Sequence, residues 1–513
     1  MNFSRLFLSF SIFLIGTLLL AREPLKPFLE GGPQQLTLDC AVAVALNQNP
    51  QILNAKQEIE RTKGQVIEVR AQALPQVNLS ATYQQQDPAL VQGQGAQAGG
   101  ARLGTAPTPT PVSTPIPIVT GTTPTPTPTP TPKPSPTPSV FIQDKTWQIT
   151  VQANQLIYSG GQVRAAIHMA KLTQDSSYFR LRDAVNTVIA TVRTQFYLVL
   201  VDRALITVQE ESVALLASQL EDQEKRLKAG TVPRFNVLQA EVALANARPN
   251  LIAARNNYRI AQLQLAKTLG YETAHLPAHV EPFNAIGELT IPAPSMDLAC
   301  ALQVARERNP SLKAQRQNIL IEIEDVVVQK AGYKPTLTAN VGYLVENDRF
   351  SSSIADAVAG WFFGIQGNWA VFDGGQTYGR VKQARAKLEQ AKINYEDSIQ
   401  QSDLQVQQAW ANLLQARETI MGGRATVEQA TEAVRLARER LGAGVGTQLD
   451  VLNATVQLTQ AQTTELQARN TYNAALAEFD RVTAISTKYN ETFQDPLIPK
   501  RACKFSDLKL QGK

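Results

Sequence analysis

The chain has 513 residues, of which 43% are apolar and 18% are charged. That apolar fraction is typical of a folded protein and excludes a chain that is disordered throughout. The formal net charge is only +5 and no basic block is present, so we expect no nucleic-acid partner. Three cysteines and three histidines are too few for a disulfide framework or a histidine-rich metal site, so we expect no metal.

The N-terminus combines a short cationic segment with an apolar stretch. Arg5 precedes the largely apolar run Leu6–Leu20, and Ala21 then offers a small residue for cleavage. This pattern predicts a secretory signal peptide over residues 1–21, with an uncleaved N-terminal anchor as the alternative. No later segment has 18 consecutive apolar residues, so we expect the mature chain to enter a membrane only as β-strands.

The remainder of the chain contains two copies of one pattern. The segment Pro75–Tyr83 recurs 260 residues later as Pro335–Tyr343, and Tyr158–Gln162 recurs 214 residues later as Phe372–Gln376. The internal similarity indicates a structural repeat. We predict a first repeat over 36–270, a linker over 271–294, a second repeat over 295–484 and a C-terminal tail over 485–513.

The two offsets differ because the first repeat carries an insertion over about 86–142. Within it, Thr105–Pro138 is dominated by Thr-Pro alternation and holds 13 prolines. This composition favours extended polyproline II structure and cannot form a packed core. We interpret the segment as a surface-loop insertion, with an SH3-type ligand or a glycosylated stalk as alternatives.

Two segments of each repeat alternate apolar and polar residues, which predicts strands with one apolar face. The apolar positions are Val77, Leu79, Ala81 and Tyr83; Trp147, Ile149, Val151 and Ala153; Leu337, Ala339, Val341 and Tyr343; and Trp361, Phe363, Ile365 and Trp369. Aromatic residues near the strand ends predict girdles at two membrane interfaces. They are Tyr83, Trp147, Tyr158, Tyr343, Trp361 and Phe372. A small soluble sheet is the alternative.

Four strands cannot close into a barrel, and an open sheet edge in lipid leaves backbone groups unpaired. Membrane strands in this chain would therefore require several copies to share one barrel. Two copies would supply eight strands and three copies twelve, and the strand count alone does not choose between them.

Each second strand leads into a very long helix. Predicted capping boxes, Ser159-x-x-Gln162 and Asp373-x-x-Gln376, start these helices. Apolar residues then recur at every seventh position, from Val185 to Leu227 and from Ile399 to Leu441, which is typical of a coiled-coil seam. The first helix, Gln162–Lys228, would be about 100 Å long. Turns at 229–233 and 442–447 return the chain into second helices, so each repeat is predicted to end in an antiparallel hairpin.

Catalytic motifs are missing from the sequence. It has no Walker loop and no G-x-S-x-G, H-E-x-x-H or C-x-x-C motif, so we expect neither an enzyme nor a cofactor. Cys40 and Cys300 occupy matching positions in the two repeats. We interpret both as small buried thiols rather than as ligands or redox centres.

The repeated order of helix, strand, strand and helical hairpin resembles that of the TolC-like outer-membrane efflux proteins. The joints Ala73-Leu-Pro75, Tyr158-Ser-Gly-Gly and Phe372-Asp-Gly-Gly contribute to this resemblance. The turns Arg226-Leu-Lys-Ala-Gly230 and Arg440-Leu-Gly-Ala-Gly444 are also similar to the family's turn motif. The resemblance covers about 36–484.

The resemblance implies a mainly α fold with membrane β-structure. Long coiled-coil hairpins would form an α-barrel in a homotrimer, and four strands per chain would contribute to a shared 12-stranded β-barrel. The protein would lie in the outer membrane of a Gram-negative-type cell, in contact with outer-membrane lipid, and extend into the periplasm.

The function that the resemblance implies is that of an exit duct of a tripartite efflux pump or a type I secretion system. It would passively conduct substrates from an inner-membrane pump of the RND, ABC or MFS type, joined through a periplasmic adaptor (membrane fusion) protein. The implied adaptor-contacting residues at the hairpin tips are Leu227, Gly230, Val232, Leu441, Gly444 and Val445. The alternative is a non-channel periplasmic coiled-coil tether or scaffold, which does not explain the four strands.

The family closes its tunnel near the tips, and motif position maps that entrance to Leu441, Gly446, Asp450 and Asn453. Only Asp450 keeps the acidic character of the family's residues. We hypothesise that three copies of Asp450 form an acidic ring that attracts cations and resists closure. A compatible alternative is that Thr447 and Asp450 are the N-cap and N3 acid of the following helix.

Overall fold

The computed structural model describes residues 35–85, 145–271, 282–294, 296–347 and 353–484. The predicted signal peptide (1–21), the insertion (86–142) and the C-terminal tail (485–513) lie outside these residues. The described residues form two compact units. One, the helical unit, falls within Met1–Val66, His168–Val326 and Lys382–Lys513, and the other, the strand unit, within Ile67–Ile167 and Val327–Val381. Each unit draws on both sequence repeats.

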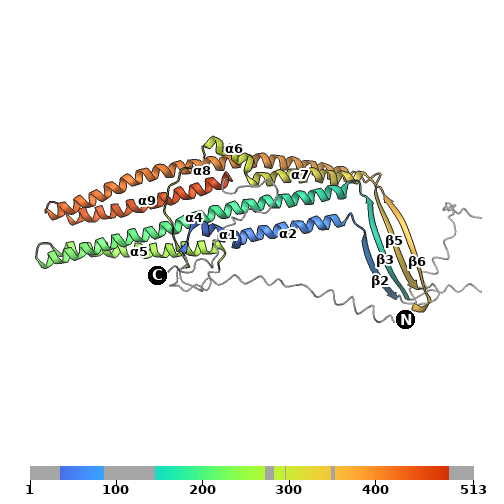
Figure 1. Ribbon diagram of the computed structural model, residues 1–513, viewed down its shortest axis with the longest axis horizontal. Helices are drawn as coiled ribbons and strands as arrows, with labels where there is room; N and C mark the ends of the chain where they lie inside the picture. Colours follow the sequence, from blue (N-terminus) through green and yellow to red (C-terminus); the bar gives the residue numbers. More distant parts are fainter. Residues whose placement is uncertain (1–34, 86–144, 272–281, 295, 348–352, 485–513) are drawn as a thin grey trace, which may run out of the picture. The chain divides into compact units, whose positions relative to one another are not determined.

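The strand unit contains a four-stranded antiparallel sheet in the order β2-β3-β5-β6 (Figure 1). Its strands are β2 (Gln76–Gln85), β3 (Lys145–Tyr158), β5 (Thr336–Asn347) and β6 (Ala357–Asn368). The four predicted strands are confirmed, but Trp369 lies just beyond β6. Its indole N–H donates a hydrogen bond to the carbonyl oxygen of Tyr333 at 3.2 Å instead of extending the alternating pattern.

The register of the strands gathers the predicted apolar residues on one face of the sheet. Leu79 lies opposite Val151, Val151 opposite Tyr343, and Tyr343 opposite Trp361. Because side chains alternate along every strand, the other face carries mainly serine, threonine, asparagine and glutamine. Leu79 is 72% exposed and Phe363 is 89% exposed, so the apolar face is uncovered in a single chain. A face of this kind requires an apolar environment.

The long helices turn back on themselves as predicted (Figure 1). The helices are α4 (Gln162–Lys228), α5 (Arg234–Leu269), α8 (Gln376–Gly442) and α9 (Gln448–Val482). The heptad positions Val192, Val199 and Val406 are fully buried, which confirms the predicted seams. An added Cβ at Gly423 would lie 3.6 Å from the Cα of Glu465, so α8 and α9 lie close together at this position.

The starts of α4 and α8 are capped by the predicted residues but in a different register. A capping box would place Gln162 and Gln376 at the third position of their helices, but each helix begins at its glutamine. The N–H group that is capped is therefore that of the residue after the glutamine. Ser159 Oγ accepts from the N–H of Val163 at 3.3 Å, and Asp373 Oδ2 accepts from the N–H of Thr377 at 2.7 Å. The hydrogen bonds from Thr377 lower the pKa of Asp373.

Each repeat starts with two helices where one was expected. They are α1 (Leu38–Gln48) and α2 (Pro50–Ala71) in the first repeat, and α6 (Leu298–Arg308) and α7 (Pro310–Lys330) in the second. The helix is interrupted at Asn49 in the first repeat and at Asn309 in the second. Each asparagine precedes a proline, and the proline ring disfavours helical backbone in the residue before it. The side-chain oxygen of Asn49 then accepts a hydrogen bond from the N–H of Gln51 at 2.8 Å.

The predicted linker contains a short strand that the sequence does not reveal. Strand β4 (Asn284–Ala285) pairs in parallel with β1 (Gln35–Leu36). Two-residue strands carry too few residues for a periodic pattern. Leu36 and Ala285 are both buried in the main core cluster of the helical unit, together with Phe196 and Phe283.

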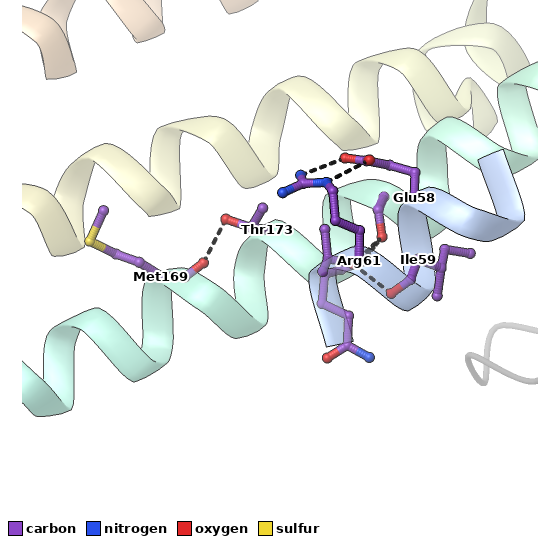
Figure 2. A network of polar contacts seen from close by, with 8 residues as sticks. Glu58, Ile59, Arg61, Met169 and Thr173 are labelled. Atoms are coloured by element: carbon purple, nitrogen blue, oxygen red, sulfur yellow. Dashed lines mark hydrogen bonds and ion pairs between the residues drawn. The ribbon is translucent and has the colours of Figure 1, made fainter. Parts of the chain in front are cut away.

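A polar contact joins α2 to α4 (Figure 2). The hydroxyl oxygens of Thr62 and Ser177 lie 3.1 Å apart, and the two residues are 1% and 4% exposed. Each hydroxyl oxygen is also within hydrogen-bond distance of a carbonyl oxygen of its own helix. Because a hydroxyl has one proton, the hydroxyl that donates across the contact does not donate to its own helix. Nearby, Arg61 forms a two-bond ion pair with Glu58 at 2.7 Å, and this pairing lowers the pKa of Glu58.

Helix α4 is apolar enough by length and composition to cross a membrane, although its sequence has no run of 18 apolar residues. An 18-residue window of α4 has a mean hydropathy of 1.4, and 56% of that window is buried. Val188, Val192 and Phe196 belong to the core cluster of the helical unit. The apolar stretch therefore has a packing role in the core of this unit.

The prediction of two buried thiols is wrong. Cys40 is half-buried and disulfide-bonded, and Cys300 is free and exposed. The buried face of α6 is formed by Ala301 and Ala305, which are one helical turn apart. Cys300 is about 100° around the helix from Ala301, so its side chain faces outward.

The contact between α5 and α1 provides a test of the fold. Gly270 has φ of 90°, and a Cβ added there would lie 2.5 Å from the carbonyl oxygen of Gln48. We expect Gly270→Ala to destabilise this contact by more than about 2 kcal/mol, because left-handed backbone alone costs an L-residue roughly 1–2 kcal/mol. Hydrogen exchange in α1 and at the end of α5 measures the effect.

Gly64 is the matched control for this substitution. It lies in α2 with no atom within 4 Å of an added Cβ. We expect Gly64→Ala to stabilise α2 by about 0.5–1 kcal/mol, because alanine restricts the unfolded chain more than glycine does. Equal exchange in the two variants would contradict the close packing of Gly270.

Candidate functional site at the hairpin tips

The tip of the first hairpin is closed by a Schellman motif, in which a left-handed residue ends a helix. The N–H of Gly230 donates to the carbonyl oxygen of Leu227 at 2.9 Å, and the N–H of Thr231 donates to that of Arg226 at 2.9 Å. Gly230 has φ of 72°, which explains the glycine. Of the predicted contact residues, Gly230 is exposed, whereas Leu227 and Val232 are half-buried.

The second tip has the same backbone. The N–H of Gly444 donates to the carbonyl oxygen of Leu441 at 3.2 Å, and Val445 and Gly446 both donate to that of Arg440 at 3.0 Å. Val445 is 69% exposed and Gly444 is exposed, while Leu441 is half-buried. The two tips therefore present similar exposed turns.

The tips differ at the start of the returning helix. In α9 the N–H of Thr447 donates to Asp450 Oδ2 at 2.9 Å, and the N–H of Asp450 donates to Thr447 Oγ1 at 3.2 Å. This reciprocal capping box confirms the predicted cap. In the first hairpin, Pro233 and Asn236 occupy the matching positions, and the N-cap Pro233 makes no side-chain cap bond.

The charge of Asp450 is stabilised by its surroundings. The hydrogen bonds from Thr447 lower the pKa of Asp450, and the nearby Arg440 cation lowers it further. The side chain is therefore a carboxylate at neutral pH. The second tip thus carries an acidic group for which the first tip has only Asn236.

A groove with a volume of about 380 Å³ lies between the last turns of α8 and the first turns of α9. Its lining residues are Ala433, Leu436, Ala437, Arg440, Asp450, Asn453, Ala454 and Gln457. Arg440 was not identified as a site residue from the sequence. The sequence does indicate that Ala433, Ala437 and Arg440 share one face of α8, because of their helical spacing. Only the structure shows that this face lines a groove against α9.

The structure separates the four residues assigned to the entrance into two pairs. Asp450 and Asn453 line the groove, whereas Leu441 and Gly446 belong to the turn. A Cβ added at Gly446 would lie 3.0 Å from the backbone nitrogen of Leu441, so a larger residue would require the turn to shift. Among the described residues, no group of three or more His, Cys, Asp or Glu side chains is placed to hold a metal ion.

The two hairpins meet through amide groups as well as apolar side chains. Gln223 Nε2 on α4 donates to Gln448 Oε1 on α9 at 3.1 Å, and the residues are 2% and 4% exposed. The other side-chain polar atoms of Gln223 and Gln448 are buried without a partner among the described residues. Leu452 packs beside them against Leu216 and Leu244. Because unpaired buried amides are costly, this contact is less favourable than the apolar seam inside each hairpin.

The predicted girdle residues all lie in or next to the sheet. Tyr83 lies opposite Trp147, and Tyr343 lies opposite Trp361 with ring centroids 5.1 Å apart. Tyr343 and Trp361 are further from the strand ends than predicted, because β5 and β6 extend beyond the alternating segments. The remaining two are Tyr158, the last residue of β3, and Phe372, which follows β6 and is 89% exposed.

The capping box of α9 predicts how the second tip responds to mutation and pH. We expect Thr447→Ala to destabilise the first turn of α9 by about 1 kcal/mol, because the Asp450 N–H loses its acceptor. The pKa of Asp450 is lowered by folding, so its stabilising effect is present at neutral pH and is lost as the pH falls from the ordinary pKa of an aspartate through the depressed pKa of the folded protein. Hydrogen exchange at 448–452 measures both effects.

Thr471→Ala is the matched control. Thr471 is an exposed residue in the middle of α9, and its hydroxyl donates to the carbonyl oxygen of Gln467 at 3.0 Å. Because alanine is the better helix former, exchange at the tip should not increase in this variant. Equal loss of protection in Thr447→Ala and Thr471→Ala would contradict the capping role.

Comparison with known proteins finds that this chain is similar to outer membrane efflux proteins. The sequence profile of the family described as "Outer membrane efflux protein" matches residues 141–271 and 301–484, more than half of the chain. The outer membrane efflux protein BepC of Brucella suis biovar 1 (strain 1330) is 26% identical over 337 residues, which span 63% of this chain and 69% of BepC. The outer membrane protein TolC of Escherichia coli (strain K12) is 32% identical over 114 residues, or 23% of its length.

A solved structure supports the fold. The outer-membrane channel OprN superposes with a TM-score of 0.66 over 87% of this chain and 89% of the other, at 16% sequence identity. Together with the repeated hairpins and the four-stranded sheet, these matches identify the architecture and place the protein in the outer membrane. The chain belongs to the outer membrane efflux protein family.

Proposed function

We propose that this protein is the outer-membrane exit duct of a tripartite efflux pump or a type I secretion system, with three copies of the chain sharing one 12-stranded barrel. The observation that carries the proposal is the sheet of the strand unit, which has one uncovered apolar face and two open edges. The energy for transport would come from the inner-membrane pump.

The open edges supply the argument for several copies. Within the described residues, β2 and β6 each pair with only one neighbouring strand. An unpaired strand edge is not tolerated in the hydrocarbon region, because no water is available to satisfy its N–H and C=O groups. Pairing β6 of one copy with β2 of the next removes every edge. Three copies, as in the family, give twelve strands.

Exposed apolar residues on α8 are consistent with the same assembly. Leu404, Leu414 and Met421 are 46%, 45% and 50% exposed in a single chain. They lie outside the buried seam formed by residues such as Val406 and Leu413. Neighbouring copies would cover these side chains in a closed ring of helices.

The hairpin tips are the surfaces proposed to bind the adaptor. Val445 is 69% exposed in the second tip, and Phe235 in the first turn of α5 is also 69% exposed. A periplasmic adaptor would join these tips to an inner-membrane pump of the RND, ABC or MFS type. A tether without a pore accounts for the hairpins but provides no reason for the apolar face of the sheet.

At the tunnel entrance we propose a charged ring formed by Asp450. Its carboxylate is ionised at neutral pH and lies beside a groove, so three copies would attract cations and repel each other. Arg440 lines the same groove and would offset part of that charge. The ring and the capping box use the same carboxylate and are compatible.

The mass and conductance of the protein extracted from outer membranes in mild detergent test the assembly. We expect about three times the mass of one 56.0-kDa chain, less the signal peptide, and ion conductance in planar bilayers. Phe363→Lys should reduce recovery of the assembled form, because a cation on the lipid face costs about 2–4 kcal/mol near the midplane. Gln366→Lys, on the polar face of the same strand, should be tolerated. A monomer recovered from the periplasm without detergent would contradict the shared barrel and favour the tether.

Ion selectivity tests the Asp450 ring. We expect Asp450→Asn to lower the permeability of cations relative to anions, measured as a shift in reversal potential across a salt gradient. Thr447→Ala is the matched control, because it breaks the same capping box but keeps the carboxylate, and it should leave the selectivity unchanged. Unaltered cation binding and conductance in Asp450→Asn would rule out the ring.

A further inference from the structure

The four joints between strands and helices lie at the same end of the sheet. Gln155 Nε2, near the end of β3, donates to the carbonyl oxygen of Ala73 at 3.0 Å. An added Cβ at Gly160 would lie 2.9 Å from the carbonyl oxygen of Ala331, so the β3–α4 joint touches the joint before β5. The indole hydrogen bond of Trp369 connects the joint after β6 to the same region. The four joints are therefore in contact with one another and form one end of the strand unit.

Apolar side chains are exposed at the joints. They are Leu74, Ile157, Tyr333, Trp369, Val371 and Phe372, with exposed fractions between 51% and 89%. They lie along the chain between the ends of the strands and the first helical turns. A membrane that covers the sheet face would therefore also reach the joints, where its phosphate groups begin.

Five cations flank these apolar residues. We call Arg70, Arg164, Lys330, Lys334 and Arg380 the cationic belt. All five are exposed, and none forms an ion pair with another described residue. Arg70 and Lys330 occupy matching positions in the two repeats.

The acids of the strand unit do not neutralise the belt. Near the joints its described residues include only Glu68 and Asp373, and the carboxylate of Asp373 already accepts hydrogen bonds from the N–H groups of Gly375 and Thr377. At the opposite end of the sheet, the described charged residues are Lys145, Glu346 and Asp356. Among the described residues, the two ends of the sheet thus differ in the sign of their net charge, with the positive charge at the joints.

We propose that the cationic belt binds the phosphate groups of anionic phospholipids in the membrane leaflet nearest the joints. From the sheet outward along the chain, the apolar and aromatic side chains come first and Arg70, Arg164, Lys330 and Arg380 come next, which matches the order of acyl chain and phosphate in a lipid. Lys334 is the exception, because it lies between Tyr333 and the start of β5. Lysine and arginine beside apolar surface extend their charged groups toward the headgroups, and each adds about 1 kcal/mol of attraction to anionic lipid. The inference rests on the proposed function only in placing the sheet in a membrane as part of the assembled barrel.

Native mass spectrometry of the assembled full-length protein tests the proposal. The wild-type protein is equilibrated with equal amounts of phosphatidylglycerol and zwitterionic phosphatidylethanolamine, and the retained lipids are counted. We expect the anionic lipid to be preferred. The triple variant Arg70→Gln, Lys330→Gln, Lys334→Gln should lose roughly fivefold of that preference per cation, or on the order of 100-fold in total. Equal retention of the two lipids by the wild-type protein would overturn the proposal.

Three controls test whether the charges of the belt themselves cause the preference. The triple variant Arg248→Gln, Arg308→Gln, Lys387→Gln removes as many exposed cations from the helical unit and should retain the preference. The charge-conserving variant Arg70→Lys, Lys330→Arg, Lys334→Arg should also retain it, and loss in either case would overturn the proposal. Competition by soluble glycerol phosphate at the lipid concentration would indicate a simple anion site and would also overturn it. Conductance of the same wild-type preparation distinguishes failure of the lipid preference from failure of the channel.

Discussion

The structure of this protein depends on one constraint, which is that every backbone N–H and C=O group in lipid must be hydrogen-bonded within the protein. The uncovered apolar face of the sheet requires an apolar environment such as lipid. Among the described residues, however, β2 and β6 are open edges, and a sheet with open edges cannot satisfy its own N–H and C=O groups in lipid. Assembly is therefore a condition for membrane insertion. The apolar face is uncovered in one chain for a separate reason, because lipid rather than protein would cover it.

Charge and polarity divide the chain into zones with different roles. The face of the sheet that carries Leu79 and Phe363 is apolar, the joints carry the cationic belt, and the second tip carries an acid. Within each hairpin the seam is apolar, whereas the contact between hairpins includes the Gln223–Gln448 pair. An apolar seam resists separation, and an amide contact with unpaired atoms resists it less. A weaker contact between the hairpins would let the proposed entrance open without unfolding either hairpin.

Periodic patterns made much of the fold predictable. Alternation identified all four strands because one face of the sheet is apolar and the other polar over many residues. The heptads from Val185 to Leu227 identified α4, because an apolar period of seven residues persists along most of this helix. The turn glycines marked the ends of the hairpins. The Asp450 cap was also predictable, because a capping box lies within four consecutive residues.

The sequence by itself determined the strands, the long helices, the hairpins and the exposed turns, because each depends on neighbours along the chain. Only the tertiary structure decided which residues of different elements meet. It brought Arg440 beside Asp450, left Cys300 exposed, and joined β1 at the start of the first repeat to β4 in the linker. It also gathered the cationic belt from four separate joints. These features depend on contacts between distant segments, and no local period records such contacts.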